Sequence, residues 1–261
     1  MADIQILPTE FISGDEIIRG DFVIPKTDGP FPGICKFHGF PGGDNQVHGI
    51  ASSLARAGFA VLTFDFRGFR RSSGLFSLAG EIEDAKSAIN HLLESNFVIA
   101  SWVGVYGASY GGAIAVCTAA RDNRIDAVCL RAPVYDTLWF AKLPMLDSEL
   151  ERIGEQNPST VHGLDSPEIR EQIMDDMVRD TKAYNPKHEI EEISPRPLFI
   201  ITGAADTLIS PDGVKSLYQQ AGEPKSLTIV DDADHGLSSR EAYTETVNHV
   251  IDWFRNTCPV L

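Results

Sequence analysis

The sequence lacks any apolar run long enough to span a membrane. Its first residues, Met1 to Gln5, also lack the basic segment and apolar core of a signal peptide. These two absences favour a cytoplasmic protein that is neither secreted nor anchored in a bilayer. Basic residues are scarce as well, with 22 Lys and Arg against 37 Asp and Glu and a net charge of −15. This charge argues against nucleic acid or an anionic membrane surface as a partner.

Cysteine is rare, and its spacing excludes the common structural metal sites. The four cysteines, Cys35, Cys117, Cys129 and Cys258, are scattered without metal-type spacing. The first three fall in predicted strands or helices, where buried free thiols are the expected state. We therefore expect no metal and no disulfide framework.

Apolar runs alternate with helical patterns along most of the chain. Continuous apolar strands that alternate with helices predict an α/β fold, with a mostly parallel twisted sheet covered on both faces. Residues 4–7 and 16–24 have no helix between them and predict an antiparallel N-terminal edge. Later strands are expected at 33–37, 59–64, 125–130, 198–202 and 226–230, and another begins at Trp102. Helices are expected at 46–57, 79–94, 211–220 and 240–255.

Residues 136–192 interrupt this alternation. No strand is evident there, helical patterns occur at 147–155 and 167–183, and the segment has 14 acidic and 6 basic residues. An insertion between two sheet strands lies over their carboxyl ends, where ligands bind in this architecture. We expect a single domain over residues 1–261 with a small helical cap at 136–192, and Trp139 and Phe140 in its apolar part as substrate-binding residues. A solvated helical excursion without a role in the site is the alternative.

The sequence Gly107-Ala108-Ser109-Tyr110-Gly111 has the G-x-S-x-G spacing of a nucleophilic serine. It follows an apolar run and precedes a helical one, which predicts a strand, a very tight turn and a helix with Ser109 at the apex. The glycines leave room where side chains would collide. The alternative is a glycine-rich connection that takes no part in chemistry.

A serine nucleophile needs a base, and a carboxylate to orient that base. His235 follows the last predicted strand, and Asp206 follows the strand expected at 198–202, so both lie at the same sheet edge as Ser109. The other six histidines fall in helices, in the inserted segment or before the serine. Asp136, after the preceding strand, is the rival acid. Asp206 is preferred because small residues precede it and Pro211 starts a helix soon after it.

Acyl transfer also requires two donors for the oxyanion. The N–H of Tyr110, directly after the serine, is one candidate. The other is the N–H of Phe40, in the loop 38–43, because Pro41 cannot donate. Glycines at 39, 42 and 43 would let this loop fold inwards. The alternative is a flexible glycine loop that His38 only braces.

Together these motifs, with Asp65-Phe66-Arg67-Gly68 and Asp234-His235-Gly236, resemble the α/β-hydrolase superfamily over nearly the whole chain, in its order of Ser, Asp and His. Within it the chain is similar to small esterase and serine-aminopeptidase-like hydrolases, including feruloyl-esterase-like and dienelactone-hydrolase-like members. Dienelactone hydrolases use cysteine where this chain has Ser109, and many relatives carry glycine where Phe69 stands.

The expected function is therefore hydrolysis of a small-molecule carboxylic ester through an acyl-enzyme on Ser109, His235 and Asp206, without a cofactor. Thioester, peptide or amide hydrolysis and acyl transfer on the same residues are alternatives, because a fold does not fix its function. A non-catalytic binding protein and a lyase that reuses the three side chains as acid and base are further alternatives. The oligomeric state is open, with a homodimer as one option.

Overall fold

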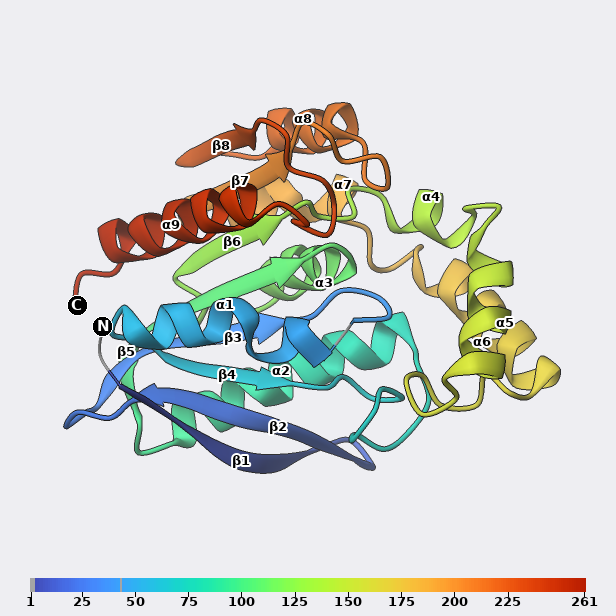
Figure 1. Cartoon of the computed structure of the whole chain (residues 1–261), viewed down its shortest axis with the longest axis horizontal. Helices are drawn as coiled ribbons and strands as arrows, with labels where there is room; N and C mark the ends of the chain where they lie inside the picture. The colour runs from blue at the N-terminus through green and yellow to red at the C-terminus, as the bar shows by residue number, and fades with distance from the viewer. Residues whose placement is uncertain (1–2, 43) are drawn as a thin grey trace.

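The computed structural model describes residues 3–42 and 44–261, with the side chains of all of these except 44–48. One eight-stranded sheet crosses it in the order β1-β2-β4-β3-β5-β6-β7-β8 (Figure 1). The strands are β1 (Ile4–Ser13), β2 (Glu16–Pro25), β3 (Phe31–Phe37), β4 (Ala60–Phe64), β5 (Val98–Ala108), β6 (Ala127–Arg131), β7 (Leu198–Gly203) and β8 (Lys225–Val230). Strands β3 to β8 are parallel, so the predicted α/β class is confirmed.

The N-terminal edge is antiparallel, as predicted. β1 pairs with β2, and β2 pairs with β4, in antiparallel register. β1 continues to Ser13, six residues beyond its predicted end at Leu7. Pro8 made the pattern look interrupted, but a proline is tolerated on an edge strand because its missing N–H faces away from the ladder.

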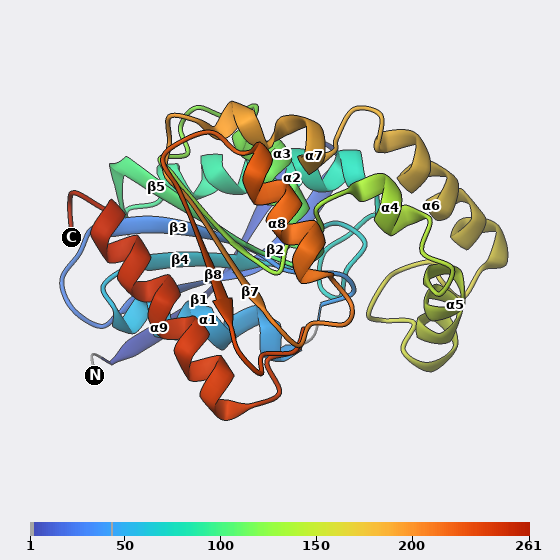
Figure 2. The same cartoon turned by 90° about the horizontal axis from the view of Figure 1, so that it is seen from above.

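Helices cover both faces of the sheet (Figure 2). One face is covered by α1 (Asp44–Arg56) and α9 (Arg240–Thr257), and the other by α2 (Leu78–Glu94), α3 (Tyr110–Ala119) and α8 (Pro211–Gln220). Alternation along β5 explains the two cores, since Val103 and Val105 belong to the α2–α3 side, and Trp102 and Tyr106 to the α1–α9 side. None of the described helices combines the length and apolar composition needed to cross a bilayer.

Five short helices connect β6 to β7. They are α4 (Thr137–Ala141), α5 (Leu146–Gln156), α6 (Pro167–Asp180), α7 (Pro186–Glu189) and the 3₁₀ helix η1 (Ile190–Ile193). Figure 1 shows α4, α5 and α6 beyond the carboxyl ends of the parallel strands. Their apolar faces join the α2–α3 core, and Asp180 at the end of α6 accepts from the N–H of Ala79 in α2 at 3.1 Å. The segment is therefore packed on the domain.

Candidate active site

Ser109 lies in the turn between β5 and α3, in a strained conformation. Its φ is 55° and its ψ −121°, a left-handed value that non-glycine residues rarely adopt. The turn is held at both backbone atoms: the Ser109 N–H donates to the Arg131 carbonyl at 2.9 Å, and its carbonyl accepts from Gly112 and Val134 at 2.9 Å each. The side chain is 7% exposed. This conformation presents the hydroxyl at the edge of the sheet.

The flanking glycines are required by close approach of the backbone. A Cβ at Gly107 would lie 2.3 Å from the Gly111 carbonyl oxygen, and a Cβ at Gly111 would lie 2.3 Å from the His38 carbonyl oxygen. A side chain at Gly107 would therefore push α3 away from β5, and one at Gly111 would push the turn away from the end of β3. This is the physical reason for the G-x-S-x-G spacing in this chain.

The three predicted catalytic side chains form one line of hydrogen bonds. His235 Nε2 lies 3.0 Å from Ser109 Oγ, and His235 Nδ1 lies 2.8 Å from Asp206 Oδ2. The other carboxylate oxygen of Asp206 accepts from the N–H groups of Leu208 and Ile209 at 2.9 and 2.8 Å. Burial by itself raises the pKa of Asp206, but the bonds from His235 and these N–H groups outweigh it and lower that pKa. Asp206 is therefore an ionised acceptor that fixes the ring.

The loops that carry Asp206 and His235 are joined through their backbones. The N–H of Ala205 donates to the Ala233 carbonyl at 3.1 Å. A Cβ at Gly203 would lie 2.0 Å from the same carbonyl oxygen, so only glycine allows this contact. The Arg131 guanidinium donates to the His235 carbonyl at 2.6 Å. The histidine is thus positioned from the ends of both β6 and β7.

Asp136, the rival acid, has a structural role. Its carboxylate caps α4 by accepting from the N–H groups of Leu138 and Trp139 at 2.9 and 3.1 Å. It also accepts from Asn185 Nδ2 at 3.0 Å and lies 3.7 Å from Lys187 Nζ. The preference for Asp206 over Asp136 therefore agrees with the geometry.

The loop after β3 packs directly on the serine. A Cβ at Gly39 would lie 2.9 Å from Ser109 Cβ. Phe40 therefore follows a residue that is in contact with the turn at Ser109. His38 is 3% exposed and braces the loop, because its Nδ1 bonds the Gly39 carbonyl at 2.8 Å and its Nε2 accepts from the Phe66 N–H at 3.1 Å. Burial lowers the pKa of His38 to about 3, so the ring is neutral. Gly43, the last glycine of the predicted loop, lies outside the described residues.

A buried ion pair between Asp65 and two arginines, which the sequence motifs did not reveal, also holds the loop after β3. Asp65 is 1% exposed and accepts from Arg70 Nε at 2.7 Å and Arg71 Nε at 2.8 Å. Arg70 Nη1 in turn donates to the carbonyls of Pro41 and Gly42 at 3.1 Å each. The only signal in the sequence was a lone aspartate at a strand end followed by two adjacent arginines.

Aromatic rings connect the loop to the inserted segment. The Phe40 ring meets Phe69, Tyr110 and Phe140 at centroid distances of 5.8, 6.2 and 6.3 Å. Phe140 is 6% exposed and lies 5.0 Å from the Tyr110 ring, so it belongs to the core. Trp139 is half-buried and stacks on Tyr135 at 4.8 Å. Of the two predicted substrate-binding residues, Trp139 is the more accessible.

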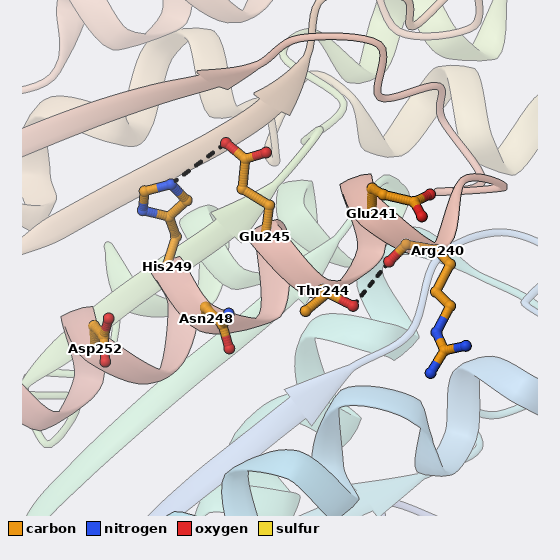
Figure 3. A pocket seen from close by; sticks show the side chains of 7 residues that line it. All are labelled: Arg240, Glu241, Thr244, Glu245, Asn248, His249 and Asp252. Atoms are coloured by element: carbon orange, nitrogen blue, oxygen red, sulfur yellow. Dashed lines mark hydrogen bonds and ion pairs between the residues drawn. The ribbon is translucent and has the colours of Figure 1, made fainter.

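A hollow along α9 lies apart from these residues. Figure 3 shows its seven lining side chains, which all come from one helix between Arg240 and Asp252. Its internal contacts are helical ones, such as His249 to Glu245 at 3.8 Å. None of the seven is a predicted site residue, and a single exposed helix face offers no enclosed binding space.

Comparisons with known proteins agree with the fold. The uncharacterized protein YfhR of Escherichia coli K12 is 29% identical over 230 residues, which cover 87% of this chain and 72% of that protein. The α/β hydrolase GrgF from Penicillium sp. sh18 superposes with a TM-score of 0.76 at 20% identity, covering 97% of this chain and 99% of that one. Est1E from Butyrivibrio proteoclasticus with bound ferulic acid gives a TM-score of 0.74 at 16% identity over 95% and 98% of the two chains.

These likenesses, with the strand order, show that the chain has the α/β-hydrolase fold. The family to which the chain belongs is shown by a match to a protein-family model. The model of the prolyl oligopeptidase family matches residues 45–259, which is most of the sequence. The chain therefore belongs to the prolyl oligopeptidase family.

Proposed function

We propose that the protein hydrolyses carboxylic esters through an acyl-enzyme on Ser109, with His235 as the base and Asp206 as the orienting acid. The observation that carries this proposal is the line of hydrogen bonds from Ser109 Oγ through His235 to Asp206, at 3.0 and 2.8 Å. Serine is a poor nucleophile until a base removes its proton. This arrangement supplies the base at one ring nitrogen and fixes its tautomer at the other.

The reaction follows from these positions. His235 Nε2 takes the proton of Ser109 as Oγ attacks the acyl carbonyl, and Asp206 stabilises the resulting imidazolium. The N–H groups of Phe40 and Tyr110 stabilise the oxyanion of the tetrahedral intermediate. His235 then protonates the leaving alcohol, and a water molecule repeats the sequence to release the acid and restore the serine. Each proton taken from a nucleophile is returned to a leaving group, so the steps need no redox partner.

Peptide or amide hydrolysis is the second candidate, because the family match is to prolyl oligopeptidases. The ester proposal is supported by structural likeness to proteins named as esterases, such as the esterase domain of a Rhodothermus marinus protein and the Pyrococcus furiosus esterase PF2001. Both reactions use the same acyl-enzyme, and they differ in the leaving group that His235 must protonate. An amine is a poorer leaving group than an alcohol, so substrate pairs with one acyl group separate the candidates.

The test is active-site labelling combined with matched substrates. We expect a fluorophosphonate probe to label the protein once per chain, at the peptide that contains Ser109, as located by mass spectrometry. A p-nitrophenyl ester should be cleaved, whereas the p-nitroanilide with the same acyl group should show no turnover above that of Ser109→Ala, because an activated ester is intrinsically more reactive than an anilide and its faster cleavage alone would not identify an esterase. Labelling at another residue would overturn the serine assignment. Anilide cleavage that depends on Ser109 would replace the esterase with an amidase or peptidase.

We expect Trp139→Ala to change the preference for acyl chain length by about 4- to 15-fold in kcat/KM, because one or two methylenes of apolar contact are worth about 0.8 kcal/mol each. Trp139 is half-buried in the segment above the strand ends. The measurement is kcat/KM across a series of p-nitrophenyl esters of increasing acyl length. Trp253→Ala is the matched control, because Trp253 of α9 is also half-buried and stacks on Phe199. Equal profiles for both variants would mean that the inserted segment does not contact the acyl chain.

A further inference from the structure

A second cavity lies on the α1–α9 face of the sheet, beside the strand ends that carry the proposed catalytic residues. Its volume is about 280 Å³, and its walls come from β3, β5 and β6 on one side and from α1 and α9 on the other. Ala108 and Gly236, the chain neighbours of Ser109 and His235, also line it. Because liquid water occupies about 30 Å³ per molecule, this space is large enough for a small ligand.

Two buried cations line this cavity. Lys36 of β3 is 4% exposed, and Arg131 at the end of β6 is 9% exposed. They share one face because Lys36 is in register with Tyr106, and Arg131 with Ala108, at alternate positions of β5. Burying a charge is costly unless an opposite charge or hydrogen bonds compensate it. Two like charges on one cavity wall therefore call for an anion.

The contacts that Lys36 and Arg131 make within the protein do not provide the compensating negative charge. Arg131 Nη1 donates to the His235 carbonyl at 2.6 Å and the guanidinium also bonds the Tyr106 hydroxyl, which leaves further N–H groups of its five. Asp65 is the carboxylate that acts on Lys36, and it is already bonded to Arg70 and Arg71. Within the described part of the chain, none of the residues that line the cavity is acidic.

The remaining polar groups of the cavity are neutral. Burial lowers the pKa of His38 to about 3 and raises the pKa of Tyr106 to about 12. Neither ring therefore carries a negative charge that would neutralise Lys36 or Arg131. On the helix side, Gly49 of α1 faces Tyr243 of α9, where a Cβ would lie 3.7 Å from the tyrosine oxygen. Tyr243 is 37% exposed, so this pair marks the mouth of the cavity.

We propose that this cavity binds a small oxyanion, a carboxylate or inorganic phosphate, between the Lys36 ammonium and the Arg131 guanidinium. Both anions offer oxygen acceptors to charge-assisted hydrogen bonds. The site is separate from the ester chemistry, because the cavity does not include Ser109 and binding is measured without turnover. Arg131 connects it to the catalytic loop, since the same guanidinium holds the His235 carbonyl.

The charge of Lys36 gives the binding a pH dependence. Burial lowers the pKa of Lys36 to about 7, with Arg70 and Arg131 acting in the same direction and Asp65 against it. The ammonium is charged below this value and neutral above it, so binding tightens as the pH falls through about 7. His38 and Tyr106 face the same space and stay neutral over this range, and Tyr243 lies at its mouth.

The test is isothermal titration of the full chain with sodium acetate and with sodium phosphate, at constant ionic strength set by sodium chloride. We expect saturable binding of at least one of the two anions. Lys36→Met, which keeps the shape of the side chain and removes its charge, should weaken binding about 10-fold or more, as loss of a charge-assisted hydrogen bond does. Lys215→Met is the control, because Lys215 lies on α8 and pairs with Asp212 at 2.9 Å.

Acetate is the clean probe for pH, because phosphate itself titrates near neutrality. Acetate binding should weaken about 10-fold between about pH 6 and about pH 8.5, and this dependence should disappear in Lys36→Met. Thermal unfolding verifies that the variant is folded. Gly49→Leu, which fills the mouth without touching either cation, should abolish binding independently. Binding of neither anion, or equal affinity in the wild type and both variants, would overturn the proposal.

Discussion

Ser109→Ala should lower kcat/KM for p-nitrophenyl acetate by at least about 10³-fold and abolish labelling by a fluorophosphonate. Without the hydroxyl, neither acylation nor phosphonylation has a nucleophile. The residual rate would come from the oxyanion donors and from substrate binding, which remain in place. Steady-state kinetics and gel fluorescence of the labelled protein measure the two losses separately.

The variant should keep its fold, because little else depends on the hydroxyl. Ser109 Oγ bonds His235 Nε2, whereas the turn itself is held through the Ser109 backbone. Alanine has the same Cβ and meets the same strain at φ 55°. Ser216→Ala, an exposed serine of α8, provides the matched control and should keep full activity. If Ser109→Ala remained folded and kept both labelling and hydrolysis, Ser109 would not be the nucleophile.

The sequence was sufficient to predict the sheet and the proximity of Ser109, Asp206 and His235, because both depend on local signals. Apolar runs predicted the strands, and parallel strands bring their carboxyl ends to one edge whatever their exact pairing. Ser109, Asp206 and His235 each lie within five residues of the end of such a run, so an error of two residues in a strand boundary did not affect them. The predicted helix over Pro211–Gln220 agrees with the structure at both ends, since proline and its flanking loop residues mark the start.

Features that depend on two distant segments were not predictable in this way. The ion pair of Asp65 with Arg70 and Arg71 and the cavity beside Lys36 and Arg131 require the register between strands. Lys36 interrupts an apolar run in the sequence, and a lysine in such a run is compatible with an exposed edge strand. Its burial follows only from the position of β3 in the middle of the sheet. The short helix α4 has only five residues, too few for a periodic pattern, and it depends on the cap from Asp136.

The same limit applies to the residues expected to bind substrate. We expected both Trp139 and Phe140 to be substrate-binding residues. Phe140, however, packs on Tyr110 in the core, and truncating a buried phenylalanine costs about 3–5 kcal/mol. Trp139 and Phe140 are adjacent on a short helix, so their side chains point to different surroundings. Which of the two is buried depends on what the helix packs against, and the sequence does not show this. Trp139 alone is therefore the useful probe of the inserted segment.

Asp206→Asn should lower kcat by about 10⁴-fold, with a much smaller effect on KM. The asparagine amide can donate to His235 Nδ1, which places the ring proton on Nε2, where it can no longer accept the proton of Ser109. The variant also loses the negative charge that stabilises the imidazolium. Steady-state kinetics on a p-nitrophenyl ester, in the pH-independent region of the profile, measure the effect.

Asp136→Asn is the matched control, because Asp136 also follows a core strand and accepts backbone N–H groups two and three residues on. It should leave the cap of α4 largely intact, because asparagine caps helices about as well as aspartate, and leave kcat within about 2-fold. Comparable losses of kcat in the two folded variants would mean that the orienting acid has been misassigned.

Wild type and Asp206→Asn should also differ in how stability depends on pH. The bonds from His235 and two N–H groups depress the pKa of Asp206, so its stabilising effect is present above the pKa of an unfolded aspartate and is lost as pH falls through the depressed value. Wild type and Asp206→Asn should therefore converge in unfolding free energy in acid, which urea titrations at several pH values would reveal.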